Sequence, residues 1–199
     1  ADAIARIAQR LDWSAGAATA LGRLLFGRRR NEPLYAEIER AVGGRRIEAL
    51  PTRFAAVATD LNLGEPVVLD AGAVAPAVAA SSAVPVWFEP VRIGSHALID
   101  GSLTAPVPVE AARQLGAQRI VAVDIAFRPY EEAPSGALDH AFQALHIATN
   151  ALAAELTRSA DHLIKLDLHH LMHGRFDADA LIDAGEQALL AIGPALRGS

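Results

Sequence analysis

The hydrophobic and polar residues of the chain follow two different periods, and the period changes near Pro51. Before this residue, apolar side chains recur every three or four positions, which is typical of amphipathic helices. After it, short apolar runs bounded by turn residues indicate strands. The first part therefore predicts three helices, over residues 1–12, 18–26 and 32–42.

The segment that follows Pro51 has the pattern of short strands joined by tight turns. The apolar run at 54–59 predicts a buried strand, and turn residues 62–65 connect it to a partner strand at 66–69. Small apolar residues at 73–83 predict a helix that ends before Pro85. Residues 91–99 predict a hairpin that turns at Gly94 and Ser95.

The last third of the chain alternates helical and strand patterns. A helix is expected at 108–115, a long helix at about 138–159 and a last helix at about 177–192. Strands are expected at 120–123, buried and parallel, and at 162–166. Strand, helix and strand in this order indicate an α/β architecture.

Composition excludes several kinds of chemistry. The 199 residues suit one domain of roughly 100 to 200 residues. The chain has no cysteine, which excludes a disulfide scaffold, a zinc–cysteine site, an iron–sulfur cluster and a thiol nucleophile. No uncharged apolar run approaches the ~20 residues of a membrane-spanning helix. The absence of cysteine and of an export signal favours a cytoplasmic location.

Charge is distributed unevenly. Residues 1–53 carry 10 Arg and 6 acids, net +4, and the remainder carries net −9, which gives the total of −5. An acidic remainder argues against nucleic-acid binding over the whole chain. The basic triplet Arg28–Arg30 forms either a solvated turn or a contact with anionic lipid head groups, which would place the protein peripherally at a membrane.

Asp100 and Gly101 are the first candidate for chemistry. A carboxylate at the end of a strand, followed by a glycine, stands where the backbone can turn sharply and leave the side chain in a cleft. On spacing alone this signal is weak, because Asp-Gly is also an ordinary turn dipeptide.

Several linked motifs in order make the signal specific. Between Arg53 and Asp124 the motifs are FAAVATDLNLGE at 54–65, AASSAVP at 79–85, FEPV at 88–91, IDGS at 99–102, PVPV at 106–109 and LGA at 115–117. In these motifs, and more loosely over the flanking helices, the chain resembles the carboxy-terminal two-thirds of the catalytic domain of patatin-like phospholipases.

The resemblance implies a fold and an activity. The expected fold is a three-layer patatin-like α/β fold with a mostly parallel central sheet flanked by helices. The expected activity is lipid acyl hydrolysis or carboxylic ester hydrolysis by a Ser-Asp dyad without cofactor or metal, acting on lipids or other lipophilic esters. By match to the motif, Asp100 takes the role of the dyad aspartate, which accepts the proton of a serine in a GxSxG elbow.

The serines of the chain depart from this family pattern. None has glycine both two residues before and two residues after it. Ser14, in Ser14-Ala15-Gly16, resembles the family's nucleophile only in part, because no strand precedes it. Together with the mid-helix pattern at residue 1, this predicts that residues 1–199 form a single patatin-like domain that is incomplete at its amino terminus. The missing parts would be the first strand and the nucleophile elbow, and the 199 residues alone would be inactive.

Other residues leave alternatives open. His169, His170 and His173 have the spacing of metal ligands, with Asp167 nearby, although a polar surface loop is the simpler interpretation. Asp60 and Asp124 stand at strand ends and are expected, with Asn62, to stabilise turns or cap elements. Trp87 and Phe88 either line an acyl pocket or fill the core.

A second function class competes with the enzyme. In it, the chain is a catalytically inert patatin-like module that binds anionic lipid or a membrane surface through Arg28–Arg30 and the adjacent Leu24, Leu25 and Phe26. The sequence does not determine the oligomeric state.

Overall fold

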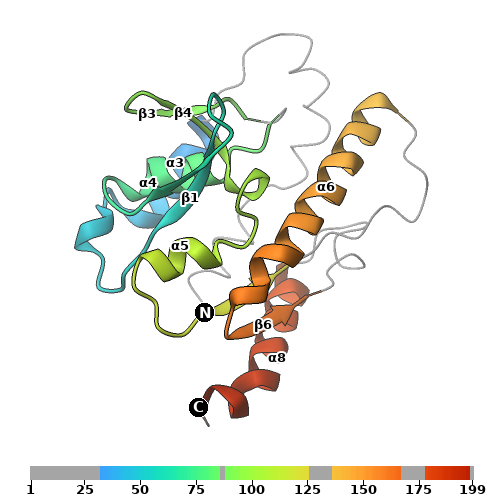
Figure 1. The fold of residues 1–199 in the computed structure, drawn as a ribbon. Helices are drawn as coiled ribbons and strands as arrows, with labels where there is room; N and C mark the ends of the chain where they lie inside the picture. The colour runs from blue at the N-terminus through green and yellow to red at the C-terminus, as the bar shows by residue number, and fades with distance from the viewer. Residues whose placement is uncertain (1–31, 86–87, 126–135, 167–177, 198–199) are drawn as a thin grey trace. The chain divides into compact units, whose positions relative to one another are not determined.

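The computed structural model describes residues 32–85, 88–125, 136–166 and 178–197 (Figure 1). These residues form two compact units, one that extends to Pro106 and one that begins at Val107. Each unit has its own sheet and its own buried hydrophobic residues. The helices expected over 1–12 and 18–26 lie outside the described residues.

Four antiparallel strands form the sheet of the first unit, in the order β2-β1-β4-β3. Strand β1 lies in the middle, is buried along its whole length and pairs with β2 on one side and β4 on the other. The strands are β1 (Ala56–Asp60), β2 (Pro66–Leu69), β3 (Val91–Ile93) and β4 (His96–Asp100).

Short connections determine the direction of the outer strands. Residues 61–65 join β1 to β2 and include Gly64, which has a φ of 69°. Residues 94–95 join β3 to β4, where Gly94 has a φ of 60°. Connections this short can only return a strand antiparallel, because a parallel pair needs a crossover of a dozen or more residues. The mostly parallel central sheet expected from the resemblance is therefore wrong for this unit, whereas the two predicted hairpins are confirmed.

The described part of the first unit contains the helices α3 (Glu32–Val42) and α4 (Val74–Ser81), as the sequence predicted. They pack against each other, and α4 also packs against β1 and β4. Because α4 consists of alanine, valine, one proline and one serine, its backbone can approach the sheet closely. The Ser81 hydroxyl donates a hydrogen bond of 2.7 Å to the carbonyl oxygen of Val57 in β1. A short helical turn, η1 (Ile47–Ala49), precedes the sheet.

The hydrophobic core of the first unit lies between α4 and the sheet. Leu98 of β4 is fully buried and packs with Ala58 of β1 and Ala80 of α4. A second cluster joins Ile47 and Val74 with alanines of β1 and α4. The core is thus built mostly from small side chains, so the backbones of helix and strands lie close together.

The second unit contains two parallel strands, β5 (Val121–Asp124) and β6 (His162–Lys165). They are connected through the long helix α6 (Ala137–Leu156) and the turn η3 (Thr157–Ser159), a crossover long enough for parallel pairing. The parallel pairing expected for the strand at 120–123 is confirmed. Two further helices are α5 (Val109–Gln114) and α8 (Ala178–Arg197), and the latter extends past the predicted end and includes Pro194.

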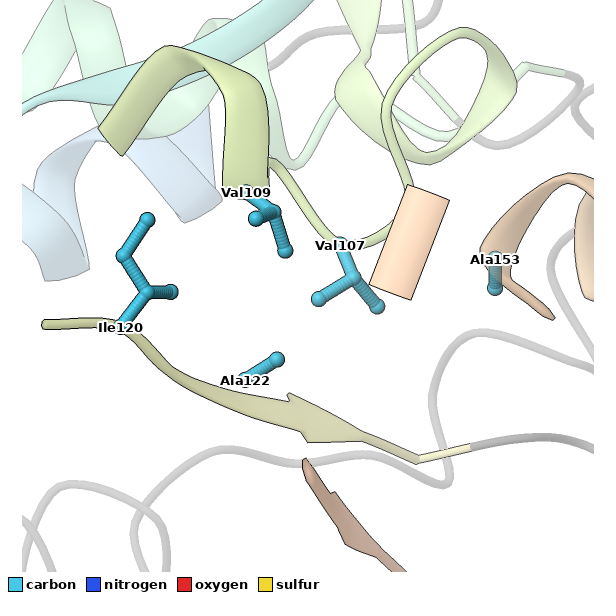
Figure 2. Close-up of a cluster of buried hydrophobic side chains, with 5 residues drawn as sticks. All are labelled: Val107, Val109, Ile120, Ala122 and Ala153. Carbon is cyan, nitrogen blue, oxygen red and sulfur yellow. The ribbon is translucent and has the colours of Figure 1, made fainter. Parts of the chain in front are cut away.

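A separate cluster of buried side chains forms the core of the second unit (Figure 2). It joins residues at the start of α5, on β5 and on α6. Its members are Val107, Val109, Ile120, Ala122 and Ala153. The α/β class expected from the sequence is confirmed by this mixture of helices and sheets.

Candidate active site

Asp100 is the last residue of β4, at the point where the chain leaves the sheet. Its backbone N–H donates to the carbonyl oxygen of Ala83, at 3.1 Å. Its side chain is half-buried, and Oδ1 accepts a hydrogen bond of 2.8 Å from the backbone N–H of Ser102. Asp100 is therefore the cap of the next short helical turn, η2 (Gly101–Leu103). The backbone hydrogen bond to Ala83 and the hydrogen bond from Ser102 together fix the position from which the Asp100 side chain extends.

Gly101 is buried against the backbone of β1. A Cβ atom at this position would overlap the carbonyl oxygen of Val57 and would lie 2.8 Å from its carbonyl carbon. Any side chain at position 101 would therefore push β1 away from η2, since backbone atoms cannot rotate aside. The glycine after Asp100 is explained by this close approach of two backbones rather than by a left-handed backbone conformation.

Two threonine hydroxyls support the backbone of Asp100 from the side of β1. Thr59 is buried, and its hydroxyl donates to the carbonyl oxygen of Asp100 at 2.8 Å. The Thr104 hydroxyl lies 2.9 Å from the same Thr59 oxygen. Because a carbonyl oxygen can only accept and a hydroxyl has one proton, Thr59 donates to Asp100 and Thr104 donates to Thr59.

The two carboxylate oxygens of Asp100 differ in their contacts. Among the residues that the structure describes, Oδ2 of Asp100 has no hydrogen bond or ion pair. A carboxylate that is anchored through one oxygen and unengaged at the other can accept a proton from a hydroxyl placed beside it. The geometry is compatible with the role of a base.

Asp60, the neighbour of Thr59, connects β1 to the other end of β4. Its buried carboxylate lies 2.6 Å from His96 Nδ1 and accepts hydrogen bonds from the backbone N–H groups of Asn62 and Leu63. The hydrogen bond from His96, followed by that from Asn62, holds the pKa of Asp60 below its ordinary value. Asp60 therefore stabilises the turn after β1, as the sequence predicted. It also binds His96, a contact that the sequence did not predict.

The remaining candidates have different positions. Asp124, at the end of β5, is buried, and its Oδ2 lies 4.0 Å from the Nζ of Lys165 on the neighbouring strand β6. Phe88 is half-buried. Within the described ranges, no group of three histidine, aspartate or glutamate side chains could hold a metal ion.

Several predicted residues lie outside the described ranges. They are Ser14, the segment 24–30 with its basic triplet, Trp87, and the cluster of Asp167, His169, His170 and His173. Their proposed roles stay predictions.

Sequence reasoning missed Thr59, Thr104 and His96. For Thr59 a signal existed, because it follows an apolar run and, with Asp60, is one of two polar residues in a strand that is buried along its whole length. A buried hydroxyl needs a partner, but only the pairing of β1 with β4 shows that the partner is the carbonyl of Asp100. His96 had no such signal, since its partner is 36 residues away.

The site is built on an aspartate at a strand end, which caps the next turn and is followed by a glycine that the close approach of a neighbouring strand requires. The family model for patatin-like phospholipase matches residues 3–113, more than half of the chain. The chain belongs to the patatin-like phospholipase family.

The chain is similar to uncharacterised NTE family proteins of Mycobacterium bovis and of two strains of Mycobacterium tuberculosis. Each is 32% identical over 96 residues, which is 48% of this chain and 27% of the relative. The matched part thus spans about a quarter of the length of these relatives.

No helix in the described part of the chain is long and apolar enough to cross a membrane.

Proposed function

We propose that these residues belong to a lipid acyl hydrolase or carboxylic ester hydrolase of the patatin type, with Asp100 as the aspartate of a Ser-Asp dyad. The observation that carries the proposal is the anchored Asp100 carboxylate, which is fixed through Oδ1 in a family whose members include phospholipases. Lipids or other lipophilic esters are the proposed substrates, and the reaction needs no cofactor.

The chemistry assigned to Asp100 is proton transfer. A serine hydroxyl is a weak nucleophile until a neighbouring group accepts its proton as it attacks the ester carbonyl. Asp100 would accept that proton and return it to the leaving alcohol, and water would then release the acyl group by the same route. Backbone N–H groups of a glycine-rich loop would stabilise the negative charge on the carbonyl oxygen.

The nucleophile is assigned to a GxSxG segment that these 199 residues do not contain. In this proposal the chain is one patatin-like domain whose amino-terminal strand and elbow are supplied by further sequence. We expect the 199 residues alone to hydrolyse no ester. Labelling of Ser14 by a fluorophosphonate probe would contradict this assignment.

The test of the proposal is ester hydrolysis by the full-length protein. We expect Asp100→Asn, which keeps an oxygen to accept from Ser102, to lower kcat on a chromogenic short-chain ester by about 10² to 10⁴-fold. Asp70→Asn is the matched control, because Asp70 is an exposed aspartate in the same unit. Turnover retained by a folded Asp100→Asn protein would refute the role of Asp100.

One observation favours a second candidate, a catalytically inert module that binds anionic lipid. It is the absence of a GxSxG serine from the chain, combined with the basic triplet Arg28–Arg30. Sedimentation with vesicles of anionic lipid distinguishes this module, since electrostatic attachment weakens as salt rises. Replacement of the three arginines by glutamine would abolish the binding, whereas Asp100→Asn would leave it unchanged.

A further inference from the structure

The hydroxyls of Thr59 and Thr104 form a short chain of hydrogen bonds that ends at Asp100. Thr104 donates to Thr59 over 2.9 Å, and Thr59 donates to the Asp100 carbonyl over 2.8 Å. The chain links three segments of the first unit: the end of β1, the end of β4 and the residue after η2. These hydrogen bonds therefore connect the segments around Asp100, the residue whose carboxylate the proposed reaction uses.

We propose that Thr59 and Thr104 are positioning residues that orient the Asp100 carboxylate for proton transfer, an inference that rests on the proposed function. Neither hydroxyl touches the carboxylate. They act through the backbone of Asp100, whose carbonyl is held by Thr59 while its amide is held by Ala83. With both peptide groups fixed, the side chain begins from a defined backbone position.

The arrangement restrains Asp100 more than the fold alone requires. Strand pairing already places Ala58 opposite Asp100, and Gly101 already packs on Val57. What the threonines add is control of the peptide plane between residues 100 and 101. Rotation of this plane would carry η2 with it, and the Ser102 amide that holds Oδ1 would move as well.

Thr59 is more buried than Thr104 and contacts the Asp100 carbonyl directly. Thr59 is 4% exposed, and without its hydroxyl the Asp100 carbonyl would lose a hydrogen-bond partner inside the protein. Thr104 is half-buried and acts one bond further away. The loss of the Thr59 hydroxyl should therefore have the larger effect on Asp100.

The test compares hydroxyl removal with hydroxyl retention in the full-length protein. Thr59→Val keeps the shape of the side chain and removes the hydroxyl, and we expect kcat to fall by about 10 to 100-fold with KM unchanged, because the base is misplaced while the substrate site is intact. Thr59→Ser keeps the hydroxyl and should restore most of kcat. Thr104→Val should give a smaller loss in the same direction.

The control is a buried threonine without this role. The Thr157 hydroxyl donates to the carbonyl of Ala153 over 2.8 Å inside the second unit. Thr157→Val removes a buried threonine hydroxyl hydrogen bond that lies within one helix end, so it should lower stability and leave kcat unchanged. A merely structural role for Thr59 would make Thr59→Val behave in the same way.

The outcomes separate this inference from the proposed function. If Asp100→Asn abolishes turnover and Thr59→Val leaves kcat unchanged, the positioning role is wrong and the dyad assignment stands. Equal losses in Thr59→Val and Thr59→Ser would also refute it, because they would implicate packing rather than the hydroxyl. Full turnover in Asp100→Asn, or none in the wild type, would refute both. If Thr59→Val does not fold, the half-buried Thr104→Val provides the same measurement.

Discussion

The two sheets of this protein are stabilised in different ways. In the first unit, β1 is buried on both faces and places two consecutive polar residues, Thr59 and Asp60, against opposite ends of β4. In the second unit, β5 alternates between exposed and buried residues and pairs only with β6 within the described residues. Between these strands, the Oδ2 of Asp124 lies 4.0 Å from the Nζ of Lys165. Outside them, Arg113 pairs with Asp161 at 3.2 Å, and Asp161 accepts from the backbone N–H of Ile120.

The comparison shows which sheet can hold a side chain in a precise position. Buried hydroxyl and carboxylate groups must be paired, so each one determines how two strands lie with respect to each other. The exposed valines at positions 121 and 123 need no partner, so they do not determine how their strand lies against its neighbour. The sheet that carries Asp100 joins its buried polar groups by hydrogen bonds of 2.6 and 2.8 Å, whereas Asp124 and Lys165 in the other sheet lie 4.0 Å apart.

The largest expected difference between the two sheets is in core packing. Leu98→Ala should lower the free energy of unfolding by about 2 to 5 kcal/mol, because Leu98 is fully buried among small residues that cannot close the cavity. Leu163→Ala, in β6, removes a side chain that is 45% exposed and should change it by less than about 1 kcal/mol. Urea denaturation followed by circular dichroism measures both, and equal losses would show that the two sheets are equally packed.

Glycine substitutions should have opposite signs in the two units. Gly101→Ala places a methyl group on the Val57 carbonyl and should destabilise the protein by about 1 to 3 kcal/mol. Gly185→Ala, within α8 and with open space around the new methyl group, should stabilise it by about 0.5 to 1 kcal/mol. The same denaturation experiment checks both, and a neutral Gly101→Ala would contradict the close approach of η2 and β1.

Acid should weaken the first sheet through Asp60. Its pKa in the folded protein is below the ordinary 3.8, chiefly because of the hydrogen bond from His96. The ionised carboxylate therefore stabilises the fold above pH 3.8, and this contribution is lost as the pH falls through the lowered value. Asp60→Asn should be less stable than the wild type at pH 6, and the difference should shrink towards pH 2.

Asp161→Asn is the matched variant in the second unit. The pKa of Asp161 is also lowered, chiefly by the Ile120 N–H, so its contribution should be lost in the same acid range. Because its carboxylate is 40% exposed, whereas that of Asp60 is 3% exposed, we expect the smaller change of the two. Urea midpoints at pH 6 and between pH 4 and 2 compare them, and a larger effect at Asp161 would reverse the comparison.

The smallest effect is expected at His146 of α6. Burial lowers the pKa of its imidazole below 6.5, so the unfolded chain binds this proton more readily than the folded protein does. Stability should therefore decline slightly as the pH falls through 6.5 towards the lowered value. The imidazole signals of His146 in NMR spectra should titrate below pH 6.5, and titration of His146 at or above 6.5 would contradict the burial of this ring.

The elements were predictable because they depend on local patterns. The two hairpins were predicted from turn residues at 62–65 and at 94–95, and α4 was predicted from small residues at 73–83. The error was the direction of the central sheet, which came from the resemblance and not from the residues. The short connections alone would have corrected it, since they do not permit parallel neighbours.

The candidate site was predictable in one residue only. Asp100 could be named because its motif is contiguous, with Gly101 beside it. Thr59, Thr104 and His96 could not be assigned partners, because each bonds to a residue more than 30 positions away. A one-residue shift of β4 against β1 would have paired different groups.

By itself, the sequence determined the helices and strands, the family to which the chain belongs and the absence of thiol chemistry, because these follow from composition, periodicity and contiguous motifs. The tertiary structure decided which buried polar groups meet. The register of β1 against β4 sets the Thr59 hydroxyl on the Asp100 carbonyl and the Asp60 carboxylate on His96. The physical reason is that hydrogen bonds act over about 3 Å, a distance that only the packing of remote segments can establish.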